Sequence, residues 1–304
     1  MRTSAAVMTI AVLAGCGSAP QAAPDRPDAV RSVDPALAPA LAGEQPTAAA
    51  DPRGLARQLT VAETTVRDPA ASPEQVAAAG QTAQVAYLTL VDRPDWDAAV
   101  LADVPAPLQD TVRRNAAAGR EFEAMATRVS TTVPAWRIVE PLAVAQLREY
   151  YAEAQRRFGV PWSVLAAVHL VETRMGRIVG LSTAGAQGPM QFLPGTWARY
   201  GLGGDVWNSR DAILGAANYL AANGGADGTD ARLDNALYRY NNDTRYVRGV
   251  RHYAALMQAD ERAVLGFHAW QVYYRTHRGE ILLPTGYEVP RSKPVEEWLA
   301  TRPR

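Results

Sequence analysis

The chain has little cysteine, no excess charge of either sign and no cluster of metal-binding residues. Its one cysteine, Cys16, excludes a disulfide framework and any zinc site built from several cysteines. Lys and Arg number 31, as do Asp and Glu, so the formal net charge is +0, whereas a nucleic-acid partner would call for a basic excess. The four histidines show no spacing of the HExxH kind. We therefore expect no nucleic-acid partner, no metal and no cofactor.

The sequence also lacks an apolar run long enough to cross a bilayer. A short one, residues 5–13, follows Arg2 and leads through Ala14 and Gly15 to Cys16. A positive residue, a short apolar run and small residues, in that order, are typical of a secretory signal. The end of this segment resembles the lipobox of bacterial lipoproteins, in which the cysteine is lipidated and becomes the mature N-terminus. The alternative is an ordinary secretory signal with an incidental cysteine.

We accordingly expect residues 1–16 to be a lipoprotein signal peptide. Lipid on Cys16 would then anchor the protein to the outer face of the cytoplasmic membrane, with its body in the cell envelope. Residues 17–52 are rich in Ala and Pro and cannot bury enough apolar surface to fold, which predicts a semi-extended, disordered tether. Residues 53–139 have helical patterning and no chemical motif, and we expect a helical accessory region there.

Residues 140–258 show helical periodicity and no strand signal of any length, so the fold should be mostly α. Pro161 suits a first helical position, and Gly176 suits a helix end. In the C-terminal tail, residues 259–304, β-formers flank Arg278-Gly279, which predicts a small hairpin over residues 272–284. We expect helices near residues 142–158, 161–175, 194–200, 209–222, 232–240 and 245–258.

The first candidate for chemistry is Glu172. It follows a nearly continuous apolar run, residues 162–171, and helical spacing puts Leu165 and Val168 on its face. Burial and the negative end of the helix dipole both disfavour the ionised carboxylate, so the pKa should rise. An acid still protonated near neutral pH can protonate a leaving oxygen. An isolated glutamate at a helix end would more often reach solvent or pair with an arginine. The neighbouring motifs therefore decide whether Glu172 is interpreted as catalytic.

The second motif is a glycine-rich loop, residues 185–197, before a short helix. Its glycines permit a tight turn that brings backbone close to a ligand. Gln191 can donate and accept hydrogen bonds, which suits a sugar hydroxyl or an acetamido group. Phe192 and Trp197 can pack under the loop or face a sugar ring, and the residues alone leave both interpretations open.

The third motif is the helix end Ala236-Leu237-Tyr238-Arg239-Tyr240-Asn241. Tyr240 shares a face with apolar residues and should point inward, while Asn241 stands where the helix ends and can adopt the left-handed conformation. Taken alone, this is a core tyrosine followed by a capping asparagine.

Together the three segments resemble the catalytic domain of lytic transglycosylases, which have a lysozyme-like, mostly helical fold. The resemblance covers roughly residues 145–258. Residues 188–197 and 216–220 are most similar to the branch typified by membrane-bound murein transglycosylases. Two departures are present. Thr173 follows the glutamate where the soluble branch has serine, and only Gly203-Gly204-Asp205 stands where relatives carry an Asp/Gly-rich insert, so no calcium site is expected.

The resemblance implies an enzyme that cleaves peptidoglycan glycan strands between N-acetylmuramic acid and N-acetylglucosamine and forms a 1,6-anhydromuramoyl end. It implies that Glu172 is the single catalytic acid and base, assisted by the substrate's own acetamido group. No protein partner is indicated. The substrate-binding residues implied are Thr173, Gly188, Met190, Gln191, Phe192, Tyr240 and Asn241.

Two alternatives stay open. One is a hydrolytic muramidase on the same fold, with Asp205, Asp211 or Asp243 as a second carboxylate. Asp211 is better explained as a first-turn residue of the following helix, where a negative charge is stabilising. The other is a non-catalytic glycan-binding lipoprotein, against which the placement of Glu172 in an apolar run argues, because burying an unneeded carboxylate costs free energy.

Overall fold

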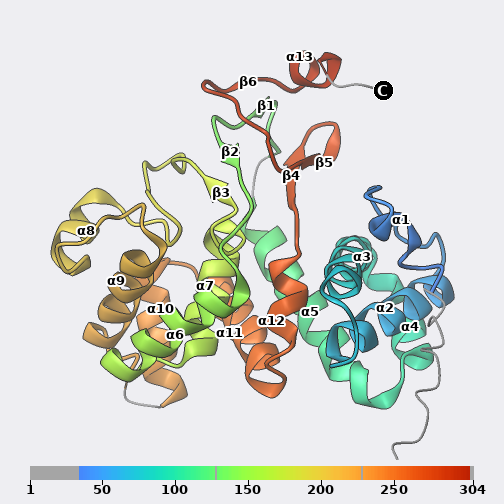
Figure 1. Ribbon diagram of the computed structural model, residues 1–304, viewed down its shortest axis with the longest axis horizontal. Helices are drawn as coiled ribbons and strands as arrows, with labels where there is room; N and C mark the ends of the chain where they lie inside the picture. The colour runs from blue at the N-terminus through green and yellow to red at the C-terminus, as the bar shows by residue number, and fades with distance from the viewer. Residues whose placement is uncertain (1–33, 127–128, 227–228, 302–304) are drawn as a thin grey trace, which may run out of the picture. The chain divides into compact units, whose positions relative to one another are not determined.

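The computed structural model describes residues 34–126, 129–226 and 229–301 (Figure 1). The signal peptide predicted for residues 1–16, the lipidation predicted at Cys16 and the first part of the predicted tether lie outside these residues. Of the described residues, 59% are helical, and the strands among them form small two-stranded sheets, which confirms the mostly α fold with small β elements. Within the described residues, no helix has the length and apolar character needed to span a membrane.

The N-terminal helices form one layer in which α2 and α3 pack against each other. α2 (Pro52–Arg67) begins after Asp51, whose carboxylate accepts from Gly54 N, and α3 (Pro73–Asp92) begins with a capping box of Ser72 and Gln75. α1 (Ala38–Leu41), η1 (Pro94–Trp96), α4 (Asp97–Asp103) and α5 (Ala106–Met125) complete this layer. Its apolar faces share one continuous core with the later helices, because α5 packs on α11 (Thr244–Ala259) and α3 on α12 (Ala263–His268).

The tether prediction is wrong for residues 34–51. Leu37 is buried in the helical core, and the amide of Gln58 accepts from Ala49 N and donates to Thr47 O. A segment with few large apolar residues is therefore held by Leu37 and Leu41 against the core and by hydrogen bonds with Gln58 of α2. The composition alone did not indicate those long-range partners. The predicted domain boundaries themselves stay a prediction.

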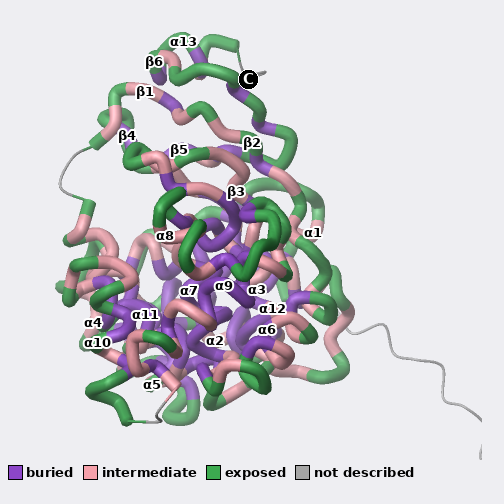
Figure 2. Tube along the Cα trace, turned by 90° about the vertical axis from the view of Figure 1, so that its left-hand side faces the viewer, coloured by how far each residue is buried: buried purple, intermediate pink, exposed green. Residues whose placement is uncertain are grey.

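The helices predicted over residues 140–258 are confirmed to within a few residues. They are α6 (Val144–Phe158), α7 (Trp162–Thr173), α8 (Pro194–Tyr200), α9 (Ser209–Ala222), α10 (Asp230–Tyr240) and α11. Figure 2 shows α7 buried among the other helices. Pro161 is the cap before α7 rather than its first residue, and the helix ends at Thr173 because Arg174 turns left-handed, with φ 54°. Gly176, with φ 89°, continues that turn.

Three antiparallel strand pairs accompany the helices. β2 (Arg137–Ile138) pairs with β3 (Ile178–Val179), a short strand that the sequence did not indicate. The predicted hairpin is confirmed as β4 (Val272–Thr276) and β5 (Gly279–Leu283). β1 (Thr132–Val133) pairs with β6 (Lys293–Pro294), beside α13 (Val295–Ala300). A second, smaller apolar core, which includes Val133, Leu283, Tyr287 and Trp298, holds these β elements together.

Candidate active site

Glu172 lies in the last turn of α7, where the helix is almost wholly buried. Leu165 and Val168 behind it have no exposed surface, whereas Glu172 keeps partial exposure. The hydroxyl of Tyr246 donates to its Oε1 at 2.7 Å. Burial raises the pKa of Glu172 to about 7, and the hydrogen bond from Tyr246 lowers it by less. The carboxyl group can therefore both give and take a proton near neutral pH.

Thr173 joins the end of α7 to the glycine-rich loop. Its hydroxyl donates to the carbonyl of Pro189 at 2.6 Å and accepts from Gly176 N at 3.1 Å. The side chain has no exposed surface, so it supports the site from within. The hydroxyl matters here because a buried carbonyl and a partly buried amide both hydrogen-bond to it.

The glycine-rich loop is a tight turn from Gly188 to Gln191. Gln187 and Phe192 exchange both backbone hydrogen bonds, and Gln191 N donates to Gly188 O at 3.0 Å. Gly188 has φ 71°, and a Cβ there would lie 1.9 Å from the carbonyl oxygen of Val206, so only glycine fits. Gln191 is left-handed, with φ 50°, which costs free energy for a residue with a side chain. Its Nε2 donates to Gly188 O at 2.9 Å.

A cluster of aromatic rings packs against the loop. The hydroxyl of Tyr240 donates to Met190 O at 2.6 Å. Its ring stacks on Tyr246 at 6.4 Å and meets the edges of Phe192 at 5.9 Å and Tyr219 at 5.4 Å. Met190 and Phe192 are buried beneath the turn. The structure thus brings Glu172, the Gly188–Gln191 turn and Tyr240 into one connected network.

Tyr246 was missed in the sequence. It is 1% exposed and is the direct partner of Glu172. The signal that could have found it is the spacing of α11, because Tyr246, Val250, Tyr253 and Met257 recur on one helical face. That face is turned inward, against α7 and α5.

Asn241 follows α10 and remains partly exposed. Its backbone is extended, with φ −136° and ψ 118°, so the left-handed helix end considered for this asparagine is wrong. The chain turns immediately into α11, whose first turn is capped by Asp243. This reversal places α10 and α11 side by side and brings Tyr240 close to Tyr246.

Each of the three candidate second carboxylates accepts a hydrogen bond from a backbone N–H close to it in the chain. Asp205 Oδ1 accepts from Trp207 N at 2.9 Å, and Asp211 Oδ2 accepts from Asp205 N at 3.0 Å. Asp243 forms an ion pair with Arg245 and accepts from its backbone N–H, which lowers the pKa of Asp243. No group of three His, Cys, Asp or Glu side chains within the described residues is placed to hold a metal ion.

Comparisons with known proteins relate part of this chain to a family of enzymes. Residues 179–234 match the family model described as transglycosylase SLT domain. This stretch contains Gly188, Met190, Gln191 and Phe192, but neither Glu172 nor Tyr240. A membrane-bound lytic murein transglycosylase F of Thiobacillus denitrificans is 38% identical over 81 residues, which is 27% of this chain and 17% of the relative.

The chain thus spans less than a fifth of the length of that relative. No solved structure matches this chain. The family model and the relative confirm the resemblance to lytic transglycosylases that the three motifs predicted.

Proposed function

We propose that the protein is a peptidoglycan lytic transglycosylase that cleaves the β-1,4 bond between N-acetylmuramic acid and N-acetylglucosamine and leaves a 1,6-anhydromuramoyl end. The observation that carries this proposal is the carboxyl group of Glu172, held by Tyr246 beside the Gly188–Gln191 turn, with its pKa raised to about 7 by burial. Such a group can act first as an acid and then as a base at the same pH.

In the first step, Glu172 gives its proton to the glycosidic oxygen while the bond from that oxygen to the muramoyl C1 breaks. The oxygen of the substrate's acetamido group bonds to C1 and takes up the developing positive charge, so no protein nucleophile is needed. In the second step, the Glu172 carboxylate removes the proton of the 6-hydroxyl, whose oxygen attacks C1 and displaces the acetamido oxygen. The proton returns to Glu172, and no water is consumed.

The surrounding residues would position the sugar. Gln191 and Asn241 are partly exposed polar side chains at the ends of the turn and of α10, where an acetamido group or hydroxyl can reach them. Tyr240 holds the turn through Met190 O. The buried residues Thr173, Met190 and Phe192 would shape the pocket from behind, and Gly188 would allow the backbone its close approach.

A hydrolytic muramidase is the nearest alternative. It would use a second carboxylate to direct water to the intermediate. Asp205, Asp211 and Asp243 are each engaged by backbone amides or by Arg245, which argues against that use. A non-catalytic glycan-binding protein would have no reason to bury the carboxyl group of Glu172.

We also propose that the enzyme works in the cell envelope, anchored through lipid on Cys16 to the outer face of the cytoplasmic membrane. Two observations support this proposal: the order of residues at the N-terminus and the membrane-bound description of the relative. Metabolic labelling with a fatty acid, in the wild type and in Cys16→Ala, tests it. Absence of label on the wild-type protein would contradict lipidation.

Mass spectrometry of the products tests the reaction. Purified peptidoglycan is treated with the full-length protein and with Glu172→Gln. We expect muropeptides that end in anhydromuramic acid from the first and none from the second. Reducing ends, heavier by one water, would show that the protein is a hydrolase. The absence of product from both proteins would favour the non-catalytic glycan-binding protein.

A further inference from the structure

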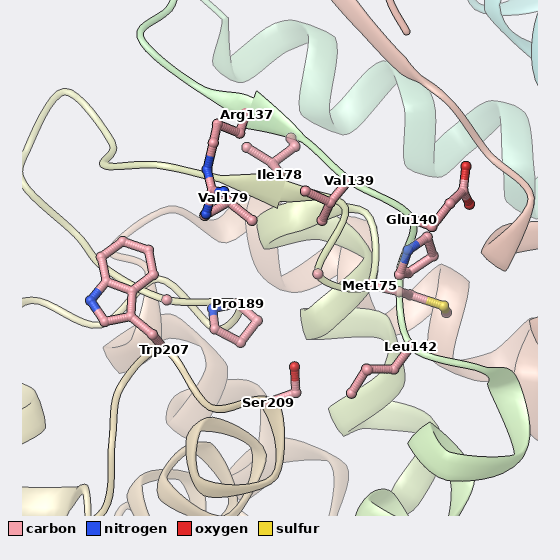
Figure 3. Close-up of a pocket in the computed structure, with 13 residues that line it drawn as sticks. Arg137, Val139, Glu140, Leu142, Met175, Ile178, Val179, Pro189, Trp207 and Ser209 are labelled. Atoms are coloured by element: carbon pink, nitrogen blue, oxygen red, sulfur yellow. The ribbon is translucent and has the colours of Figure 1, made fainter. Parts of the chain in front are cut away.

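A pocket of about 490 Å³ opens next to the glycine-rich turn, and Glu172 is not among the residues that line it (Figure 3). Its walls come from the segment that includes β2, from the residues after α7, from the turn at Gly188 and Pro189, and from Trp207. Its volume is in the range of sites that bind small ligands. The mechanism proposed above leaves this pocket without a role.

The lining combines an apolar floor with the guanidinium of Arg137. Val139, Met175, Ile178 and Pro189 supply apolar surface. Trp207, which is 45% exposed, presents a large aromatic ring that the fold does not bury. An exposed aromatic residue at the edge of a concave site is typical of a ligand-binding surface rather than of a core.

Arg137 supplies the charge. Within the described residues its guanidinium makes neither an ion pair nor a side-chain hydrogen bond. The acidic residue of the same pocket, Glu140, is already engaged, because it accepts from Arg177 at 3.2 Å and from Thr285 at 2.8 Å. In Figure 3 the guanidinium of Arg137 points toward Val179 and Trp207, while the carboxylate of Glu140 points away from them. The pocket is therefore complementary to an anion with small apolar groups.

The pocket also touches the catalytic turn. Pro189 lines it with one face, while its carbonyl accepts the hydroxyl of Thr173, the neighbour of Glu172 in the chain. Gly188 and Gln191 belong to the same tight turn. A group bound in the pocket would lie against Gly188 and Pro189, in the same turn as Gln191, as a substituent of the same substrate could.

We propose that this pocket binds the acidic stem peptide carried by the glycan strand, with a peptide carboxylate on Arg137 and alanine methyl groups against Trp207 and the apolar floor. The proposal rests on the function proposed above, because it takes peptidoglycan as the substrate. It assigns Arg137 and Trp207 as substrate-binding residues that distinguish peptide-bearing strands from bare glycan.

Direct binding of a peptide tests this without any turnover. The probe is the free tetrapeptide alanyl-γ-glutamyl-diaminopimeloyl-alanine, titrated calorimetrically into the full-length protein. The variants are Arg137→Ala, Trp207→Ala, Glu172→Gln and, as the matched control, Arg57→Ala, an exposed arginine of α2. We expect Arg137→Ala to weaken binding about tenfold, the effect of losing one charge-assisted hydrogen bond. Arg57→Ala and Glu172→Gln should bind as the wild type does.

Trp207→Ala guards against a folding defect in Arg137→Ala, because Trp207 is exposed and its loss leaves no cavity in the core. It too should weaken the binding of the peptide. No binding to the wild type, or equal binding by the wild type, Arg137→Ala and Trp207→Ala, would overturn the proposal.

Kinetics then separate this proposal from the proposed function. On peptide-bearing strands, Arg137→Ala should raise KM about tenfold with kcat little changed, and on peptide-free glycan both constants should match the wild type. An equal loss on both substrates would overturn the proposal. If the wild type cleaves neither substrate yet binds the tetrapeptide through Arg137, the proposed reaction fails while the peptide site stands.

Discussion

Two glutamates of the described helices, one buried and one partly exposed, are each hydrogen-bonded by a tyrosine hydroxyl, and only the second is placed to do chemistry. Glu63 in α2 accepts from Tyr87, and Glu172 in α7 accepts from Tyr246. Glu63 also forms an ion pair with Arg67, one helical turn later, and Arg67 lies 3.2 Å from Asp260. Glu172 makes no ion pair with any residue in the described part of the chain.

The difference shows what makes a buried carboxylate into an acid. An arginine follows Glu172 closely, but Arg174 turns left-handed and donates to Leu170 O, with its guanidinium 6.0 Å from the ring of Trp270. The backbone turn that ends α7 thus directs the guanidinium of Arg174 toward Trp270, so that it forms no ion pair with Glu172. Without that charge, burial decides, and the pKa of Glu172 rises to about 7.

The largest effect we expect is the loss of turnover in Glu172→Gln. Glutamine keeps the shape and can still accept from Tyr246, but it cannot give a proton to the leaving oxygen. Removal of a general acid slows a reaction by about 100- to 10,000-fold. The measurement is the release of anhydromuropeptides, with Glu63→Gln as the matched control in the other region. Loss of turnover to the same extent in both variants would show that Glu172 has no special role as the general acid.

Glu63→Gln should instead cost stability. It removes the charge of one partner of a largely buried ion pair and leaves Asp260 as the carboxylate partner of Arg67. We expect the free energy of unfolding to fall by about 3 kcal/mol, with activity per folded molecule unchanged. Denaturant unfolding measures the first quantity, and Glu261→Gln, an exposed glutamate, serves as the control that should change little. A Glu63→Gln protein as stable as the wild type would show that the ion pair contributes nothing.

The pH dependence of stability sharpens the comparison. The pKa of Glu172 in the folded protein, about 7, exceeds the ordinary value of 4.5. Between these values the unfolded chain has released its proton and the folded chain has not, so stability falls as the pH rises through this window. Glu172→Gln removes that effect. The two proteins should be equally stable near pH 4, and the variant should be more stable by about 3 kcal/mol above pH 8.

Denaturant unfolding of both proteins from pH 4 to 8.5 gives the difference directly, because the other titrating groups are the same in both. A constant difference across this range would mean that the pKa of Glu172 is not raised on folding. The result does not depend on any substrate. It therefore tests the electrostatics of the site separately from the reaction.

The sequence predicted the part of the site that depends on local pattern. The apolar run before Glu172 indicated a buried helix, and burial of that helix is what raises the pKa. The glycines indicated a tight turn, and Gly188 needs both its left-handed backbone and its missing side chain.

What the sequence did not indicate depends on contacts between distant segments. Tyr246 reaches Glu172 only because α11 packs against α7. The residues around Leu37 are ordered only because Gln58 and the core hold them. β3 exists only because residues 137–138 lie beside it. A strand of two residues has no periodicity to detect.

Tyr246→Phe should have the smallest effect. It removes one hydrogen bond to Glu172 and keeps the ring that stacks on Tyr240. That hydrogen bond lowers the pKa of Glu172, so its loss should raise the pKa further. The alkaline limb of the pH–rate profile should shift to higher pH, with the maximal rate reduced about tenfold or less. Tyr87→Phe, the equivalent change at Glu63, should leave the pH–rate profile unmoved. If Tyr246→Phe also leaves it unmoved, Tyr246 only packs against Glu172 and does not set its proton affinity.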